Sequence, residues 1–208
     1  MKNTHYWTPT TTTARRPTVL VDVDGPLCAF DKAAVTIVNR ITGKHYTVDD
    51  IETWEIFESI EKDNPYVKSL VYNEIKSRGS ILGFEVQGDA KEGIEKLKKV
   101  CELVIVTSPF WGSETWVHER DQWLYDHFKI KHHDVIHARK KHHVAGDFLI
   151  DDKLENLKQW SSRFPGGTPL LWSRPSNRHD AGFPRVSTWD EVIAMMSPVA
   201  ASADRLLP

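Results

Sequence analysis

Residues 19–27 form an apolar run that ends in two acidic side chains and a turn. The Val-Leu-Val run is typical of a buried strand, and Gly25 and Pro26 end it. Because strand side chains alternate between faces, Asp22 and Asp24 are expected to share a face. Buried carboxylates are costly unless a cation or a proton accompanies them. The segment therefore predicts a charged site at a strand end; a surface turn rich in Asp and Gly is the weaker alternative.

Strand-like runs recur along the chain and alternate with helical patterns. The runs lie at 19–23, 103–107, 148–151 and 169–172. Residues 89–99 and 153–160 have apolar side chains at helical spacing, and Thr188 and Glu191 have the spacing of a capping box. Strands that alternate with helices predict an α/β fold built on a parallel sheet.

A long interval separates the first two strand-like runs. Residues 28–88 contain helical segments and several aromatic residues, so we expect a helical cap over the strand end. Most of its aromatic side chains should form the cap's own core, and a minority should face a ligand: Phe30, Tyr46, Trp54, Phe57, Tyr66, Tyr72 and Phe84. The expected domains are a disordered tail (1–17), an α/β core (18–27 and 89–196), the cap (28–88) and a flexible tail (197–208).

Composition limits the class of protein. A chain of 208 residues with eight Trp suits one globular domain with an insertion. A formal net charge of −2 argues against long nucleic acid as a partner. No stretch reaches the length of a membrane span, and two cysteines, Cys28 and Cys101, suit a reducing cytoplasm. Residues 1–18 weakly resemble an organelle transit peptide, but a disordered tail is favoured.

Further polar groups follow the other strand-like runs. Thr107 and Ser108 end the second run, and Asp151 and Asp152 end the third. The basic triplet 139–141 precedes the second acidic pair. Each signal alone is weak, but in a parallel sheet strand ends meet at one edge, so together they predict one site.

This order of motifs resembles the haloacid dehalogenase superfamily of phosphotransferases, over roughly residues 18–192. Within it the chain is most similar to the 5′(3′)-deoxyribonucleotidases. The stretches that carry this resemblance are 22–30, 107–109, 116–120 and 139–153. In the last stretch the family pattern is matched by Arg139, Lys141, Gly146, Asp147, Asp151 and Asp152, which favours Lys141 over Lys140 as the motif lysine.

The resemblance implies a Rossmann-like core and a Mg²⁺-dependent phosphomonoesterase for small phosphorylated substrates, above all nucleoside monophosphates. Asp22 would attack phosphorus and form an aspartyl phosphate, and Asp24 would act as acid and base. Thr107 or Ser108 would hold phosphoryl oxygens together with Lys141. Mg²⁺ ligands would be Asp22, the Asp24 carbonyl and Asp152, with Asp151 just outside them.

Two departures from the family pattern concern the site. Pro26 replaces an apolar residue and removes a backbone N–H, and Ala138-Arg139-Lys140 replaces Thr-Arg-Asp. A phosphatase for a sugar phosphate, or a phospho-acceptor module without catalysis, are the alternative functions, and a homodimer is left open.

Other chemical signals are weaker. Five histidines between 132 and 143 could suggest zinc, but a solvated loop is favoured. Cys28 is expected to be a buried thiol rather than a nucleophile. Phe110 and Trp111 could stack on a ligand or pack the cap, with equal weight.

Overall fold

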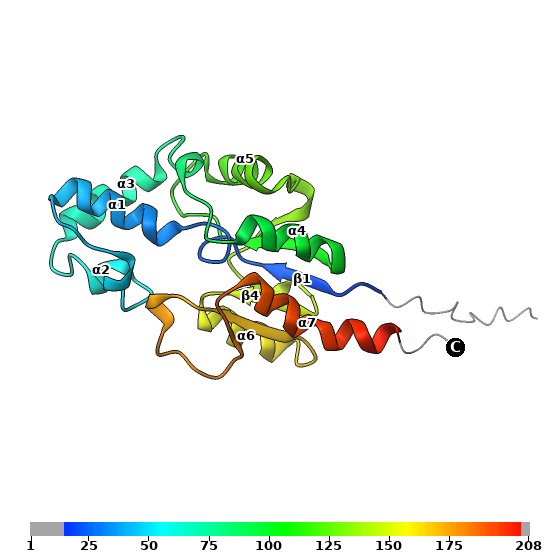
Figure 1. Ribbon diagram of the computed structural model, residues 1–208. Coiled ribbons are helices and arrows are strands. Elements are labelled where there is room, and N and C mark those ends of the chain that lie inside the picture. Colours follow the sequence, from blue (N-terminus) through cyan, green and yellow to red (C-terminus); the bar gives the residue numbers. More distant parts are fainter. Residues whose placement is uncertain (1–14, 205–208) are drawn as a thin grey trace, which may run out of the picture.

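A computed structural model describes residues 15–204, with side chains up to residue 196, and shows a six-stranded parallel sheet (Figure 1). The strand order is β3-β2-β1-β4-β5-β6, which places β1 inside the sheet. The strands are β1 (Thr18–Val21), β2 (Glu102–Thr107), β3 (Val135–His137), β4 (Phe148–Asp151), β5 (Thr168–Trp172) and β6 (Arg185–Val186). The four predicted strands are confirmed; the short outer strands β3 and β6 were not predicted.

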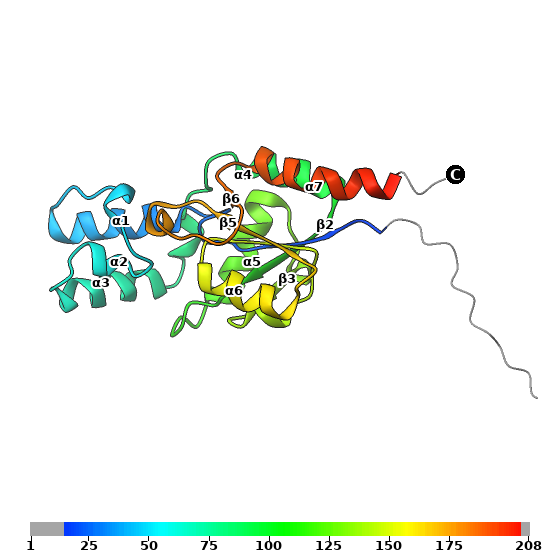
Figure 2. The same cartoon turned by 90° about the horizontal axis from the view of Figure 1, so that it is seen from below.

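Helices cover both faces of the sheet, as the alternating pattern predicts. Val19 and Val21 pack into one core cluster with α4 (Ala90–Val100), α5 (Trp116–Phe128) and α7 (Trp189–Asp204). Leu20, which points to the opposite face, packs with α6 (Leu154–Arg163). Figure 2 shows α4 and α7 on one side of the sheet and α6 on the other. The predicted capping box is present: the Glu191 N–H donates to Thr188 Oγ1 at 3.3 Å.

The interval between β1 and α4 folds into a helical cap. Its helices are α1 (Phe30–Thr42), α2 (Ile56–Ser59) and α3 (Pro65–Lys76), with 3-10 turns at Val48–Asp50 and Ile81–Gly83. They group together beyond the end of the sheet (Figures 1 and 2). A Rossmann-like α/β fold with a helical cap after the first strand is thus confirmed. The cap limits at residues 28 and 88 stay predictions.

At both ends, the described structure continues past the predicted limits of the core, residues 18 and 196. The Glu102 N–H donates to the Pro17 carbonyl at 2.9 Å, and Arg15 pairs with Asp147 at 2.7 Å. Residues 15–17 therefore contact the segments next to β1 in the sheet. Helix α7 continues to Asp204, past residue 196. The rest of the predicted tails, residues 1–14 and 205–208, lies outside the described residues. Between residues 15 and 204, no helix has both the length and the apolar character needed to cross a membrane.

Candidate active site

The register of the sheet brings the two acidic pairs together. Val21 is paired with Ile150, and the Asp22 N–H donates to the Ile150 carbonyl at 2.9 Å. The next residues on these two strands, Asp22 and Asp151, therefore lie side by side at the carboxyl edge. One carboxylate oxygen each from Asp22, Asp151 and Asp152 lies within 4.8 Å of the others, and all three residues are buried. Within residues 15–196, no other group of three potential ligands is this close.

Lys141 bridges the first two of these carboxylates. Its Nζ lies 2.7 Å from Asp22 Oδ1 and 2.7 Å from Asp151 Oδ2, and the side chain is 2% exposed. Lys140, by contrast, is exposed. Burial alone would lower the pKa of Lys141, but the two adjacent carboxylates outweigh it and raise the pKa. The structure therefore places Lys141, and not its neighbour, beside Asp22.

Asp22 has an environment that disfavours its negative charge. Burial raises its pKa to about 7, Asp151 and Asp24 add to that rise, and Lys141 opposes it. A further positive charge near Asp22 would favour the ionised carboxylate, which is the form that can act as a nucleophile.

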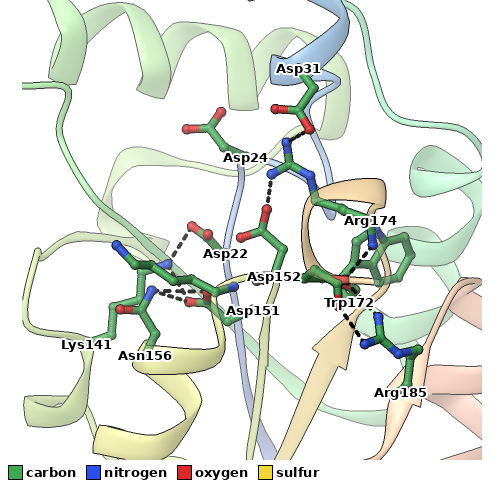
Figure 3. Close-up of polar contacts among 12 residues, drawn as sticks. Asp22, Asp24, Asp31, Lys141, Asp151, Asp152, Asn156, Trp172, Arg174 and Arg185 are labelled. Atoms are coloured by element: carbon green, nitrogen blue, oxygen red, sulfur yellow. Dashed lines mark hydrogen bonds and ion pairs between the residues drawn. The ribbon is translucent and has the colours of Figure 1, made fainter. Parts of the chain in front are cut away.

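The two residues of the second acidic pair differ in their hydrogen bonds. Asp151 accepts from the Lys153 N–H at 2.9 Å and from the Asn156 amide at 3.0 and 3.1 Å, in addition to Lys141. Asp152 is paired through Oδ2 with Arg174, whereas its Oδ1 is buried and has no hydrogen-bond partner (Figure 3). An unpartnered buried carboxylate oxygen is costly, and a cation would satisfy it.

The charges of this cluster support the same conclusion. Arg174 also pairs with the buried Asp31 of α1, so one guanidinium joins cap and core (Figure 3). The cluster then holds four carboxylates, of Asp22, Asp31, Asp151 and Asp152, and two cationic side chains, of Lys141 and Arg174. With all four carboxylates ionised, the cluster has two negative charges in excess, which one divalent cation would balance. Because oxygen ligands suit Mg²⁺, the residues present fit that ion.

The turn after β1 separates Asp24 from the other acids. Gly25 has φ +99°, and a Cβ there would lie 2.6 Å from Asp152 Oδ2, so glycine is required on both counts. The Asp24 carboxylate points away from the Asp22 and Asp152 carboxylates (Figure 3). Instead it accepts a hydrogen bond of 2.7 Å from Arg120 on α5.

The two predicted hydroxyl groups have different surroundings. Thr107, at the end of β2, is fully buried, and its Oγ1 has no hydrogen-bond partner. Ser108 Oγ donates to the Ala138 carbonyl at 3.3 Å. Thr107 is thus the hydroxyl still in need of an acceptor such as a phosphoryl oxygen.

A cavity of about 450 Å³ opens beside Asp24, between core and cap. Its aromatic lining comes from Phe30, Trp54, Tyr72, Phe110 and Trp111. It also contains charged side chains of both signs: Asp24, Asp31, Glu55, Lys76, Arg139 and Arg174. The cavity therefore offers flat apolar surfaces near the acids, together with groups that can hydrogen-bond a polar ligand.

The two aromatic residues after Ser108 differ from each other. The Phe110 ring packs against Tyr72, with centroids 5.7 Å apart, and against Trp116 at 5.1 Å, while it also lines the cavity. Trp111 is 79% exposed at the cavity wall. Of the predicted cap-core aromatics, Phe57 and Phe84 are buried, whereas Tyr66 is exposed.

The sequence alone predicts no role for several side chains that hydrogen-bond or pair with the acidic residues of the site or with their partners. They are Asp31, Arg120, Asn156, Arg174 and Asn177, whose amide donates to the Asp152 and Trp172 carbonyls at 2.8 Å. One signal was available for Arg120, because it lies between Trp116 and Trp123 at helical spacing, which makes it a charge within an apolar stripe. Asp31, Arg174 and Asn177 approach the site only through long-range folding.

The weaker signals give no second site. His132, His133 and His143 are exposed, and none of the five histidines joins a three-ligand group among the described residues. Cys28 is buried, and burial raises its pKa to about 12, so the thiol stays neutral. This agrees with the expectation that Cys28 is not a nucleophile.

Comparisons with solved structures identify the fold. The fold is similar to a protein from Burkholderia xenovorans LB400 described as a haloacid dehalogenase-like hydrolase, with a TM-score of 0.58 and 13% identity over 89% of this chain and 99% of that one. It is also similar to a HAD-hydrolase from Bacillus subtilis bound to magnesium, with a TM-score of 0.57 and 14% identity over 88% of this chain and all of that one. The chain has the haloacid dehalogenase fold.

Comparisons of the sequence identify the family. The family described as "5′ nucleotidase, deoxy (Pyrimidine), cytosolic type C protein" matches residues 16–203. A 5′(3′)-deoxyribonucleotidase of Bacillus subtilis (strain 168) is 24% identical over 84% of this chain and 95% of its own length. The cytosolic-type human 5′(3′)-deoxyribonucleotidase is 25% identical over 80% of this chain and 84% of its own. The chain is a phosphatase of the haloacid dehalogenase type. It belongs to this 5′-nucleotidase family.

Proposed function

We propose that this chain is a Mg²⁺-dependent phosphomonoesterase that hydrolyses deoxyribonucleoside monophosphates through an aspartyl phosphate on Asp22. The observation that carries the proposal is the Asp22 carboxylate at a strand end, 2.7 Å from the buried Lys141 ammonium. It also lies within 4.8 Å of a carboxylate oxygen of Asp152, whose Oδ1 has no hydrogen-bond partner. The family match and the names of the relatives support the nucleotide substrate.

In the first half of the reaction, Asp22 attacks phosphorus and the bond from phosphorus to the sugar oxygen breaks. Asp24 donates a proton to that leaving oxygen, which accelerates the step by about 10²–10⁴-fold for a well-placed acid. Lys141 and the Thr107 hydroxyl hold the phosphoryl oxygens. Lys141 also screens Asp22 from the negative charge of the substrate.

In the second half, the aspartyl phosphate is hydrolysed. Asp24, now ionised, takes a proton from water as that water attacks phosphorus. The bond from phosphorus to Asp22 breaks, inorganic phosphate leaves, and Asp22 and Asp24 return to their starting protonation states.

The metal would be held by the Asp22 carboxylate, the Asp24 backbone carbonyl and Asp152. Asp151 would stay outside this set, because Lys141, Lys153 and Asn156 already use both of its oxygens. When bound, Mg²⁺ supplies positive charge that stabilises the transferring phosphoryl group.

The cavity supports a nucleotide over a compact sugar phosphate. Phe30, Tyr72 and Phe110 line it with ring surfaces, on which a nucleobase can stack. A nucleobase presents a larger flat apolar surface to these rings than a sugar does, so it would use more of this lining. A cytoplasmic location, a possible homodimer and the lack of long nucleic-acid and membrane partners stay predictions from the sequence.

The test is phosphate release from a panel of deoxyribonucleoside, ribonucleoside and sugar monophosphates and p-nitrophenyl phosphate, with and without Mg²⁺. We expect Mg²⁺-dependent turnover with the deoxyribonucleoside monophosphates as the best substrates. Turnover of sugar phosphates alone would contradict the nucleotide assignment, and no turnover of any ester would contradict the whole proposal.

Asp22→Asn tests the nucleophile. It should abolish turnover and leave the circular dichroism close to that of the parent, because Asp151 still pairs with the Lys141 ammonium. The matched control is Asp190→Asn, because Asp190 is a surface carboxylate with 73% of its side chain exposed, and it should remain fully active. Near-normal activity of Asp22→Asn would show that another residue attacks phosphorus.

A further inference from the structure

Helix α5 buries the guanidinium of Arg120 between two tryptophan rings. Arg120 is 0% exposed and lies on the same helix face as Trp116 and Trp123. Its Cζ is 4.9 Å from the centre of the Trp116 ring and 5.6 Å from that of Trp123. A buried charge has a large desolvation cost, and an apolar side chain of similar volume would pack between the rings without it.

The carboxylate that pairs with Arg120 is that of Asp24. Nη2 donates to Asp24 Oδ1 at 2.7 Å, while Nε and Nη1 are buried without a hydrogen-bond partner. The side chain of Asp24 is 25% exposed and lines the cavity. The hydrogen bond of Arg120 therefore fixes one oxygen of Asp24 and leaves the carboxylate at the cavity wall. Cys28 packs nearby as a neutral thiol and provides no competing anion.

We propose that Arg120 is a positioning residue for Asp24, which it holds in the orientation that delivers a proton to the leaving oxygen. This inference rests on the proposed function, because it assigns Asp24 the acid role. Neither the metal cluster nor the phosphoryl contacts involve Arg120 directly. Arg120 donates to one oxygen of Asp24, which leaves the other oxygen to carry the proton, whereas Lys141 and Arg174 pair with the other acids.

A comparison of two leaving groups separates positioning from general structural support. A sugar alkoxide needs a proton as it leaves, whereas p-nitrophenolate leaves without one. The value of kcat/KM reports the steps up to the first irreversible one, here the formation of the aspartyl phosphate, so it does not include the later role of Asp24 as base. We would measure kcat/KM of the parent, Arg120→Met and Arg120→Lys on the best nucleotide of the panel and on p-nitrophenyl phosphate.

For Arg120→Met we expect kcat/KM on the nucleotide to fall about 100-fold, within the range for loss of a general acid, and kcat/KM on p-nitrophenyl phosphate to fall less than about 5-fold. Arg120→Lys keeps a charge that can reach Asp24 and should recover part of the nucleotide rate. The control is Arg163→Met, which removes an exposed arginine of α6 and should change neither value.

Equal losses on both substrates, or no loss on the nucleotide, would overturn the positioning role. If Arg120→Met does not fold, as judged by circular dichroism, Arg120→Lys decides the question. It should then show a nucleotide loss at least about 5-fold larger than its aryl phosphate loss, and equal losses would overturn the proposal. If the parent protein hydrolyses neither ester, the proposed function itself is wrong. The parent is measured first, so this outcome is distinguished from a failure of the positioning role.

Discussion

At the scale of single residues, Lys141 holds two buried carboxylates in one position. Its ammonium is 2.7 Å from both Asp22 and Asp151, and none of the three is more than slightly exposed. Removing one partner from such a buried group leaves a charge without a counter-charge. The free-energy cost of that exceeds the net stabilisation that the intact pair provides. Lys141 therefore supports the fold of the strand ends as well as the proposed chemistry.

We predict that Lys141→Met lowers the free energy of unfolding by about 3–5 kcal/mol at neutral pH without added metal. Lys140→Met, which removes the exposed neighbouring lysine, should change it by less than about 0.5 kcal/mol. Urea denaturation followed by Trp fluorescence measures both values. Comparable small effects from the two variants would mean that the contacts of Lys141 contribute little to folding.

At the scale of elements, α4 and α7 approach each other through a glycine. A Cβ at Gly93 of α4 would lie 2.1 Å from Cγ of the fully buried Trp189, which begins α7. The absence of a side chain thus sets how closely the two helices pack. Glycine is a poor helix residue, so here the packing requirement outweighs helix propensity.

Gly93→Ala should therefore destabilise the protein by about 1–3 kcal/mol through overpacking, although alanine favours the helix by about 1 kcal/mol. Gly166→Ala is the control, because a Cβ there meets nothing within 4 Å and the change should be neutral or stabilising by less than about 1 kcal/mol. Thermal unfolding of both variants gives the answer. A Gly93→Ala variant more stable than the parent would show that the helices can move apart at no cost.

The strands that can be predicted from the sequence are those with a continuous run of apolar residues. β1, β2, β4 and β5 are apolar runs, and their ends locate Asp22, Thr107 and Asp151. β3 and β6 contain only three and two residues, and they pair at the outside of a sheet that local sequence does not reveal. Arg174 lies beyond β5, and it approaches Asp152 and Asp31 only because the sheet and the cap bring them together.

At the scale of the whole molecule, the site is shared between the core and the cap. The core supplies Asp22, Asp152 and Lys141, whereas Asp31 and the rings of Phe30 and Tyr72 come from the cap. The ion pairs of Arg174 join the two parts beside the acid cluster. The core motifs therefore predict the chemistry, while the substrate depends on how the cap encloses the cavity, which sequence motifs do not specify.

In the proposed mechanism Asp22 carries the phosphoryl group and Asp24 serves as acid and base. The Asp24→Asn variant with p-nitrophenyl phosphate and Mg²⁺ separates these two roles, because this leaving group departs without an acid while hydrolysis of the intermediate still needs a base. Rapid mixing should give a burst of about one nitrophenolate per protein, and acid quenching should yield a phosphorylated peptide bearing Asp22. Steady turnover with neither a burst nor a phosphorylated peptide would show that Asp22 and Asp24 do not have these roles.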